Sequence, residues 1–182
     1  MAGNGISRRT FLYTTAALSA TATLGTVLGG TDPAFAAINS RVAWDFFIAK
    51  GLTAVQAAGV LGNLAQESNI DPLAQEPGGP GRGIAQWSAG GRWDATPNAN
   101  ATWYAASTGQ SVWSLRAQLE FIWWELTNIP AYGLAELKGA ATIAAATIVF
   151  QNRFERCGTC HQATRISYAT NYYNQYAGTV TP

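Results

Sequence analysis

The chain has few of the residues that most often build metal and redox sites. Its 182 residues include one histidine, two cysteines and one methionine, and only 12% are charged. With 11 basic and 10 acidic side chains, the net charge of +1 gives no basic footprint for nucleic acid, and we expect none as a partner. One histidine and one cysteine pair are too few for a closed zinc site, so we expect no metal and no cofactor.

Apolar runs long enough to span a bilayer are also missing after the first 36 residues. The N-terminus reads Ser7-Arg8-Arg9-Thr10-Phe11-Leu12, followed by an apolar run to about residue 29 and then Ala34-Phe35-Ala36. This order is typical of a twin-arginine signal peptide with its cleavage site. We expect residues 1–36 to be removed and residues 37–182 to form one secreted, monomeric domain without stable membrane insertion. A membrane anchor is the alternative.

The two cysteines, Cys157 and Cys160, lie in the short segment Cys-Gly-Thr-Cys-His. In a cytosolic protein this spacing would suggest thiol redox chemistry or half a zinc site. No βαβ pattern surrounds the pair, and His161 is the only histidine. For an exported protein we therefore expect a structural disulfide, with a thiol oxidoreductase as the alternative.

Apolar residues recur at helical spacing over most of the chain. Helices are expected near residues 38–50, 53–69, 111–126, 130–139, 143–156 and 162–176. Residues 71–91 are rich in Gly and Pro, and residues 83–87 have the pattern of a short strand or hairpin arm, whereas residues 94–110 look like a polar loop. The sequence thus predicts a mainly α, single-domain fold of the α+β lysozyme-like type, with a small β-hairpin or irregular insert after the second helix.

The helix expected at residues 53–69 carries an acidic residue, Glu67, in its last turn. Thr53 and Gln56 have the spacing of a capping box, and Pro72 should end the helix near Asn69. The negative end of the helix dipole and partial burial both favour the protonated carboxylic acid, which is the form that a general acid needs. An exposed Glu in a fraying helix end is the alternative.

The Gly-rich insert could form one wall of a cleft beside Glu67. Gln86 can hydrogen-bond sugar amides and hydroxyls, and Trp87 can lie against a pyranose ring. Each residue also has a plainer explanation: Gln86 as an exposed strand residue, and Trp87 as part of the core.

Glycosidases generally use a pair of carboxyl groups, and the sequence does not identify the second one. The candidates are Glu76, Glu155, Asp94 and Asp71. A turn explains Asp71, an ion pair with Arg92 explains Asp94, and an ion pair or helix-end contact explains Glu155. Glu76 lies in the insert, from where it could reach the cleft.

Several segments together resemble the phage tail lysozyme family and, more distantly, soluble lytic transglycosylases. They are residues 57–68 (AAGVLGNLAQES), Asp71-Pro72 and residues 83–87 (GIAQW), and the similarity continues to about residue 176. The resemblance implies a lysozyme-like fold and cleavage of peptidoglycan glycan strands between their amino sugars. It also implies that Glu67 is the general acid and that Ser68 and Gln86 support it. The cysteine pair departs from the family, in which Pro often stands at position 157.

These observations predict a secreted glycosidase that hydrolyses the β-1,4 bond between N-acetylmuramic acid and N-acetylglucosamine. A lytic transglycosylase, which uses one Glu and leaves anhydro-muramoyl ends, is the alternative within the same chemistry. An inactive cell-wall-binding module is the alternative from another class, although it gives no reason for Glu67 to lie beside Gln86.

Overall fold

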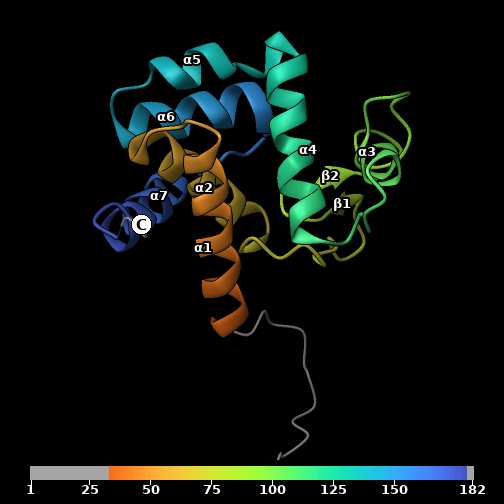
Figure 1. Cartoon of the computed structure of the whole chain (residues 1–182), viewed down its shortest axis with the longest axis horizontal. Coiled ribbons are helices and arrows are strands. Elements are labelled where there is room, and N and C mark those ends of the chain that lie inside the picture. Colours follow the sequence, from red (N-terminus) through yellow and green to blue (C-terminus); the bar gives the residue numbers. More distant parts are fainter. Residues whose placement is uncertain (1–32, 180–182) are drawn as a thin grey trace, which may run out of the picture. The chain divides into compact units, whose positions relative to one another are not determined.

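The computed structural model describes residues 33–179 of the chain. These residues form seven α-helices, two short strands, a 3-10 turn and a π-helical segment (Figure 1). In chain order they are α1 (Pro33–Ala49), α2 (Ala54–Ser68), β1 (Gly81–Arg82), β2 (Trp87–Ser88), α3 (Ala101–Ser107), α4 (Leu115–Asn128), η1 (Pro130–Tyr132), α5 (Leu134–Gly139), α6 (Ile143–Phe150), the π-helical η2 (Gln151–Glu155) and α7 (Gln162–Tyr176). The expected mainly helical fold with a small hairpin after the Glu67 helix is confirmed.

The first described helix begins earlier than the sequence predicted. The twin-arginine motif and the apolar run after it lie outside the described residues, but α1 starts at Pro33 and includes the expected cleavage site at residues 34–36. Proline is favoured in the first turn of a helix, and the alanines that follow are strong helix formers. The side chains of Phe35 and Ile38 are 64% and 59% exposed. None of the helices within residues 33–179 has the length and apolar character needed to cross a bilayer.

Helix α2 is the central helix, and its residues 56–65 are all buried. Thr53 caps it: its Oγ1 accepts the N–H of Gln56 at 3.4 Å, while the Gln56 Oε1 accepts the N–H of Thr53 at 2.9 Å. The predicted capping box is therefore confirmed. Asn69 ends the helix in the left-handed conformation, with φ of 56°. Glu67 consequently lies in the last turn, as expected.

Two glycines let α6 and α7 lie directly against α2. A Cβ atom on Gly59 would lie 2.6 Å from the Cβ of Ala146 in α6. A Cβ atom on Gly62 would lie 2.6 Å from the Cβ of Ala169 in α7 and would also clash with the carbonyl oxygen of Arg165. A glycine inside a helix costs about 1 kcal/mol relative to alanine, so the close backbone approach explains both positions.

The insert after α2 contains an antiparallel hairpin made of β1 and β2. The sequence predicted a strand or hairpin arm over residues 83–87, but residues 83–86 are the turn, and only Trp87 belongs to a strand. Gly83 and Gln86 have φ values of 69° and 47°, which lie in the left-handed region and not in the β region.

One side chain, Gln118 of α4, joins the insert to the helical body. Its buried amide accepts the N–H of Ile84 at 2.9 Å and donates to the carbonyl oxygens of Pro72 and Val112 at 2.9 and 2.8 Å. At the end of α2, the Ser68 hydroxyl donates to the carbonyl oxygen of Ile84 at 3.0 Å. The turn of the hairpin is thereby fixed next to Glu67.

Residues 94–110 contain a helix, α3, where the sequence predicted a loop, so that prediction was wrong. Asn100 starts the helix, because its Oδ1 accepts the N–H of Trp103 at 2.7 Å. The Trp103 ring contacts Trp124 of α4 edge to face, with ring centroids 5.4 Å apart. Tertiary packing therefore stabilises a seven-residue helix that its own sequence pattern hardly supports.

Candidate active site

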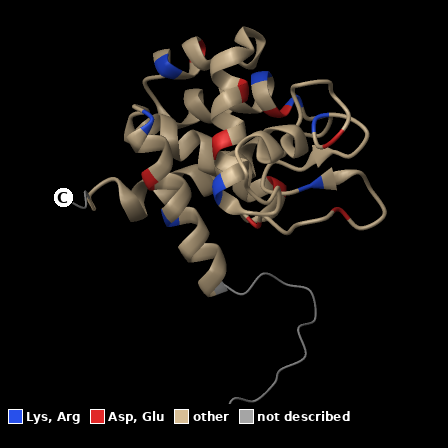
Figure 2. Ribbon diagram, turned by 45° about the vertical axis from the view of Figure 1, so that its right-hand side comes forward, with Lys and Arg blue, Asp and Glu red and all other residues tan. Residues whose placement is uncertain are grey.

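The charged residues of the described fold are few, and both signs are interspersed (Figure 2). Five of them form one cluster and come from separate parts of the chain. They are Glu67 of α2, Arg92 of the loop after β2, Glu125 of α4, Glu155 of η2 and Arg165 of α7. Glu125 and Arg165 are buried, with 0% and 2% exposure. Buried charges are tolerated when they are paired, so the pairing within this cluster determines its chemistry.

The Glu67 side chain is 20% exposed and lines a polar cleft of about 460 Å³. The cleft lies between the end of α2 and the insert that follows it. Its lining residues are Glu67, Ala74, Gln75, Glu76, Pro77 and Gln86. The fold thus brings Glu67 together with two other residues that the sequence singled out, Glu76 and Gln86.

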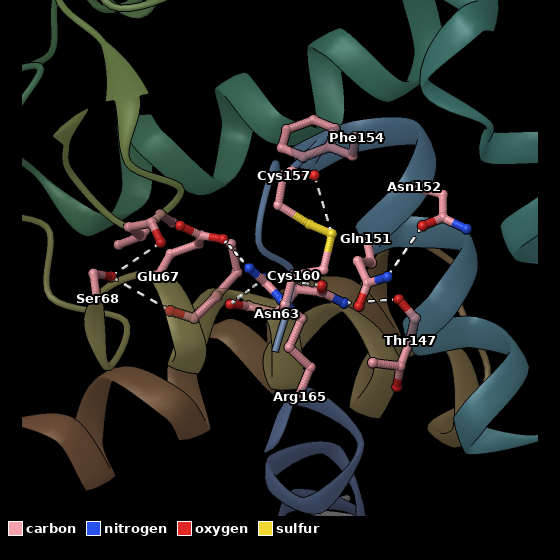
Figure 3. A network of polar contacts seen from close by, with 12 residues as sticks. Asn63, Glu67, Ser68, Thr147, Gln151, Asn152, Phe154, Cys157, Cys160 and Arg165 are labelled. Carbon is pink, nitrogen blue, oxygen red and sulfur yellow. Dashed lines mark hydrogen bonds and ion pairs between the residues drawn. A yellow bond between two sulfur atoms is a disulfide. The ribbon is translucent and has the colours of Figure 1, made fainter. Parts of the chain in front are cut away.

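Arg165, in the first turn of α7, is the ion-pair partner of Glu67 (Figure 3). Its Nη2 donates to Glu67 Oε1 at 2.6 Å, its Nη1 to Asn63 Oδ1 at 3.1 Å, and its Nε to the carbonyl oxygen of Cys160 at 2.6 Å. The sequence analysis did not include this ion pair, and its expectation about the ionisation of Glu67 stays a prediction.

Glu155, the last residue of η2, has a carboxyl group directed into the same cluster. Its Oε1 is buried and has no hydrogen-bond partner. Burial raises the pKa of Glu155 well above its ordinary value, and the negative charge of Glu67 raises it further, while Arg92 and Arg165 oppose both effects. Among the described residues its carboxyl group forms neither the ion pair nor the helix-end contact expected as alternatives to catalysis. Glu155 is thus a partly buried side chain with one buried carboxyl oxygen, and both its burial and the nearby charge of Glu67 raise its pKa.

Arg92 and Glu125 form a second ion pair in the cluster. The Nε and Nη2 atoms of Arg92 donate to the two Glu125 oxygens at 2.8 and 2.9 Å, and Trp87 Nε1 donates to Glu125 Oε2 at 3.1 Å. Trp87 is only 2% exposed, and its ring packs against Trp93 and Phe121. The expectation that Trp87 stacks on a sugar is therefore wrong, because its ring lies in the core and its N–H is used by Glu125.

Two of the candidate second carboxylates stabilise turns. Asp71 Oδ1 accepts the N–H of Leu73 at 2.9 Å, and Asp94 Oδ1 accepts the N–H of Gly90 at 2.7 Å. The turn expected for Asp71 is present, whereas Asp94 does not pair with Arg92 as expected. Neither carboxylate lines the cleft.

Glu76 and Gln86 line the cleft, and each also holds the insert in shape. Glu76 Oε2 accepts the N–H of Gly81 at 3.1 Å, and the Gln86 side-chain amide donates to the carbonyl oxygen of Gly83 at 2.9 Å. Ser68 acts through its bond to the hairpin turn. Roles of these residues in substrate binding or catalysis stay predictions.

The sequence prediction missed Arg165, Arg92 and Glu125 as members of the cluster. A signal existed for Arg165, since it is four residues before Ala169 and therefore shares the buried face of α7. Glu125 likewise follows Ile122 by three residues on the buried face of α4. Arg92 gave no such signal, because it lies in an irregular loop.

Cys157 and Cys160 form a disulfide, as expected. It closes the loop between η2 and α7, next to Arg165 (Figure 3). The part of the chain that the structure describes contains no free cysteine and no group of three His, Cys, Asp or Glu side chains placed to hold a metal ion.

A comparison with family models matches residues 39–176 to phage tail lysozymes. The chain belongs to the phage tail lysozyme family. The match includes α2, the insert and the whole charged cluster, and it confirms the resemblance seen in the sequence. A search of curated proteins finds no match.

As a phage tail lysozyme, the chain is expected to cleave peptidoglycan. The position of Glu67 on the wall of a polar cleft accords with that activity.

Proposed function

We propose that this phage tail lysozyme hydrolyses the β-1,4 bond between N-acetylmuramic acid and N-acetylglucosamine, with Glu67 as the general acid. The observation that carries the proposal is the position of Glu67. Its carboxyl group lines the polar cleft on one side and meets the charged cluster on the other. Cleavage of a glycosidic bond requires a carboxylic acid that protonates the leaving oxygen.

The charges of the cluster explain how Glu67 can receive a proton although Arg165 pairs with it. The cluster contains three carboxyl groups and two guanidinium groups, so it is neutral when the carboxyl groups hold one proton among them. Glu125 is already paired with Arg92 through two hydrogen bonds. We assign this proton to Glu67 and Glu155, which interact electrostatically. When the proton is on Glu67, the leaving oxygen in the cleft can accept it.

Glu76 is the best-placed second carboxylate for a hydrolase, because it lines the same cleft as Glu67. One of its oxygens accepts a backbone N–H, as a carboxylate does, and we assign it the role of activating water. The same bond also supports a second candidate function. Because Glu76 holds its own loop in shape, its role can be wholly structural, and Glu67 alone would then serve as acid and base in a lytic transglycosylase.

The proposal is tested on purified peptidoglycan, by turbidity clearing and by mass spectrometry of the products. We expect reducing-end muramic acid products and complete loss of clearing in Glu67→Gln with binding retained. Glu136→Gln is the control, because Glu136 is an exposed carboxylate paired with Arg153 on the surface. If the products carry anhydro-muramoyl ends, the reaction is that of a lytic transglycosylase and not hydrolysis. Clearing by Glu67→Gln would refute the assigned acid, and a parent protein that binds but never clears would be a binding module.

We also propose export by the twin-arginine route with cleavage after Ala36. Cleavage would remove the first four residues of α1, where Phe35 is 64% exposed, so it would take little buried area from the core. N-terminal sequencing of the protein from the culture medium should give Ala37 as the first residue. An intact Met1 in exported protein, or retention of export after Arg8→Lys/Arg9→Lys, would refute this route.

A further inference from the structure

We propose that the disulfide loop at residues 157–160 is a positioning element of the active site, acting on Glu67 through Arg165. This inference rests on the proposed function of Glu67 as the general acid. It goes further by giving an active-site role to a bridge that the sequence predicted to be only structural.

Arg165 is held at all three of its guanidinium nitrogen atoms. Each of its three nitrogen atoms has a separate partner: Nη2 binds Glu67, Nη1 binds Asn63, and Nε binds the carbonyl oxygen of Cys160. The side chain is 3% exposed, so no solvent competes for these bonds. A planar guanidinium with three fixed partners has one orientation, and the carboxylate that it binds is oriented with it.

Besides Glu67, Arg165 has two anchors, Asn63 and Cys160, and they differ in how firmly each is held. Asn63 lies inside α2 with 0% exposure, and its Nδ2 donates to the carbonyl oxygens of Gly59 and Thr147 at 2.8 and 3.0 Å. This anchor is fixed by helix packing. Cys160 instead lies in a loop in which Gly158 is exposed, so this anchor needs another constraint.

The disulfide between Cys157 and Cys160 supplies that constraint. Both residues that flank the bridged segment, Arg156 and His161, have left-handed backbones with φ of 53° and 48°. Such conformations are unfavourable for residues with a Cβ atom. The Cys157–Cys160 bridge spans the segment between these two residues and so constrains the loop that carries the Cys160 carbonyl oxygen.

The predicted consequence of breaking the bridge is a loss in the chemical step. The Cys160 carbonyl oxygen moves, Arg165 loses one of its anchors, and the Glu67 carboxyl group is no longer fixed in one orientation. Misplacement of a catalytic group by 1 Å can lower the rate by about 10²-fold. For the loss of one of two anchors we expect about a tenfold fall in kcat, with KM nearly unchanged because the cleft wall is intact.

The experiment compares kcat and KM of Cys157→Ser/Cys160→Ser, Arg165→Lys and the combined variant, using soluble glycan-strand fragments. Arg165→Lys keeps the positive charge but cannot contact all three partners, so we expect a similar fall in kcat. In the combined variant the two losses should not multiply, because both act through one contact. Arg153→Met is the matched control: Arg153 is an exposed arginine of η2, and its loss should leave kcat unchanged.

Each outcome supports or overturns the proposal. A double-serine variant that melts at a lower temperature but keeps its kcat at a temperature where it is folded would show that the bridge is only structural. Losses that multiply in the combined variant would also overturn the proposal. If the double-serine variant does not fold, an Arg165→Lys enzyme with unchanged kcat overturns it. Activity of Glu67→Gln in the same assay would instead refute the proposed function.

Discussion

Replacing Arg92 by methionine should strongly destabilise the fold, because it leaves Glu125 as a buried carboxylate without its cation. Glu125 is 0% exposed and receives two hydrogen bonds from Arg92, leaving only the Trp87 N–H after the substitution. Removing one partner of a buried ion pair costs about 3–5 kcal/mol. The guanidinium also lies over the rings of Tyr132 and Phe154, at 4.6 and 4.5 Å from their centroids, but the apolar methionine can keep part of that packing. We expect a loss of about 3–5 kcal/mol in the free energy of unfolding at pH 7.

The pH dependence of this loss tests the cause. Burial raises the pKa of Glu125 above its ordinary value, and Arg92 opposes that shift. Without Arg92 the pKa rises further, so the folded variant holds a proton that its unfolded chain releases at neutral pH. The stability of the variant therefore falls as the pH rises from about 4 towards 7, more steeply than that of the parent. The difference between the two should be smallest near pH 4, where the Glu125 charge is neutralised.

Urea unfolding followed by tryptophan fluorescence at pH 4 and pH 7 measures the effect. Arg116→Met is the control, since Arg116 is 80% exposed in its pair with Glu120 and should contribute below about 1 kcal/mol. Arg92→Met/Glu125→Gln should recover much of the loss, because no charge is left unpaired. A loss below about 1 kcal/mol at pH 7, or an equal loss at both pH values, would contradict the assignment of a buried, charged Glu125.

Three further predictions concern the packing and the ionisation of the site. Gly62→Ala should lower the free energy of unfolding by about 1–3 kcal/mol in urea titrations, because the added Cβ meets Ala169. An unchanged urea midpoint would refute the close approach of α2 and α7. Glu155→Gln should raise the free energy of unfolding at pH 7–8 and give no gain near pH 4, since the raised pKa of Glu155 makes the folded parent less stable as the pH rises through it. An equal effect at both pH values would refute the raised pKa of Glu155. Ser68→Ala should lower the free energy of unfolding by about 1 kcal/mol, because the hydrogen bond to the Ile84 carbonyl oxygen is lost. Amide hydrogen exchange should then be faster in residues 83–86 only.

Features that depend on neighbouring residues could be predicted from the sequence. The capping box of α2, the end of that helix at Asn69 and the short disulfide each involve residues at most four positions apart. The position of Glu67 in the last turn followed from them. The hairpin insert was predicted for the same reason, since Gly and Pro exclude a helix locally.

Features that depend on distant contacts could not be predicted from the sequence. Arg165 is 98 positions from Glu67, and Glu125 is 38 positions from Trp87, so only the folded chain shows that they pair. The burial of Trp87 likewise depends on packing against Trp93 and on Phe121, which is 34 positions away. The helix α3 was missed because packing against α4 stabilises it more than its own pattern does.

The two glycines of α2 have a consequence for engineering. At Gly59 and Gly62, main-chain atoms of α2 face only the backbone and the Cβ methyl groups of Ala146 in α6 and Ala169 in α7. The spacing between α2 and α7, and with it the distance from Glu67 to Arg165, therefore depends on two glycines and two alanines. Attempts to stabilise the protein by enlarging interior side chains should therefore leave these four positions unchanged.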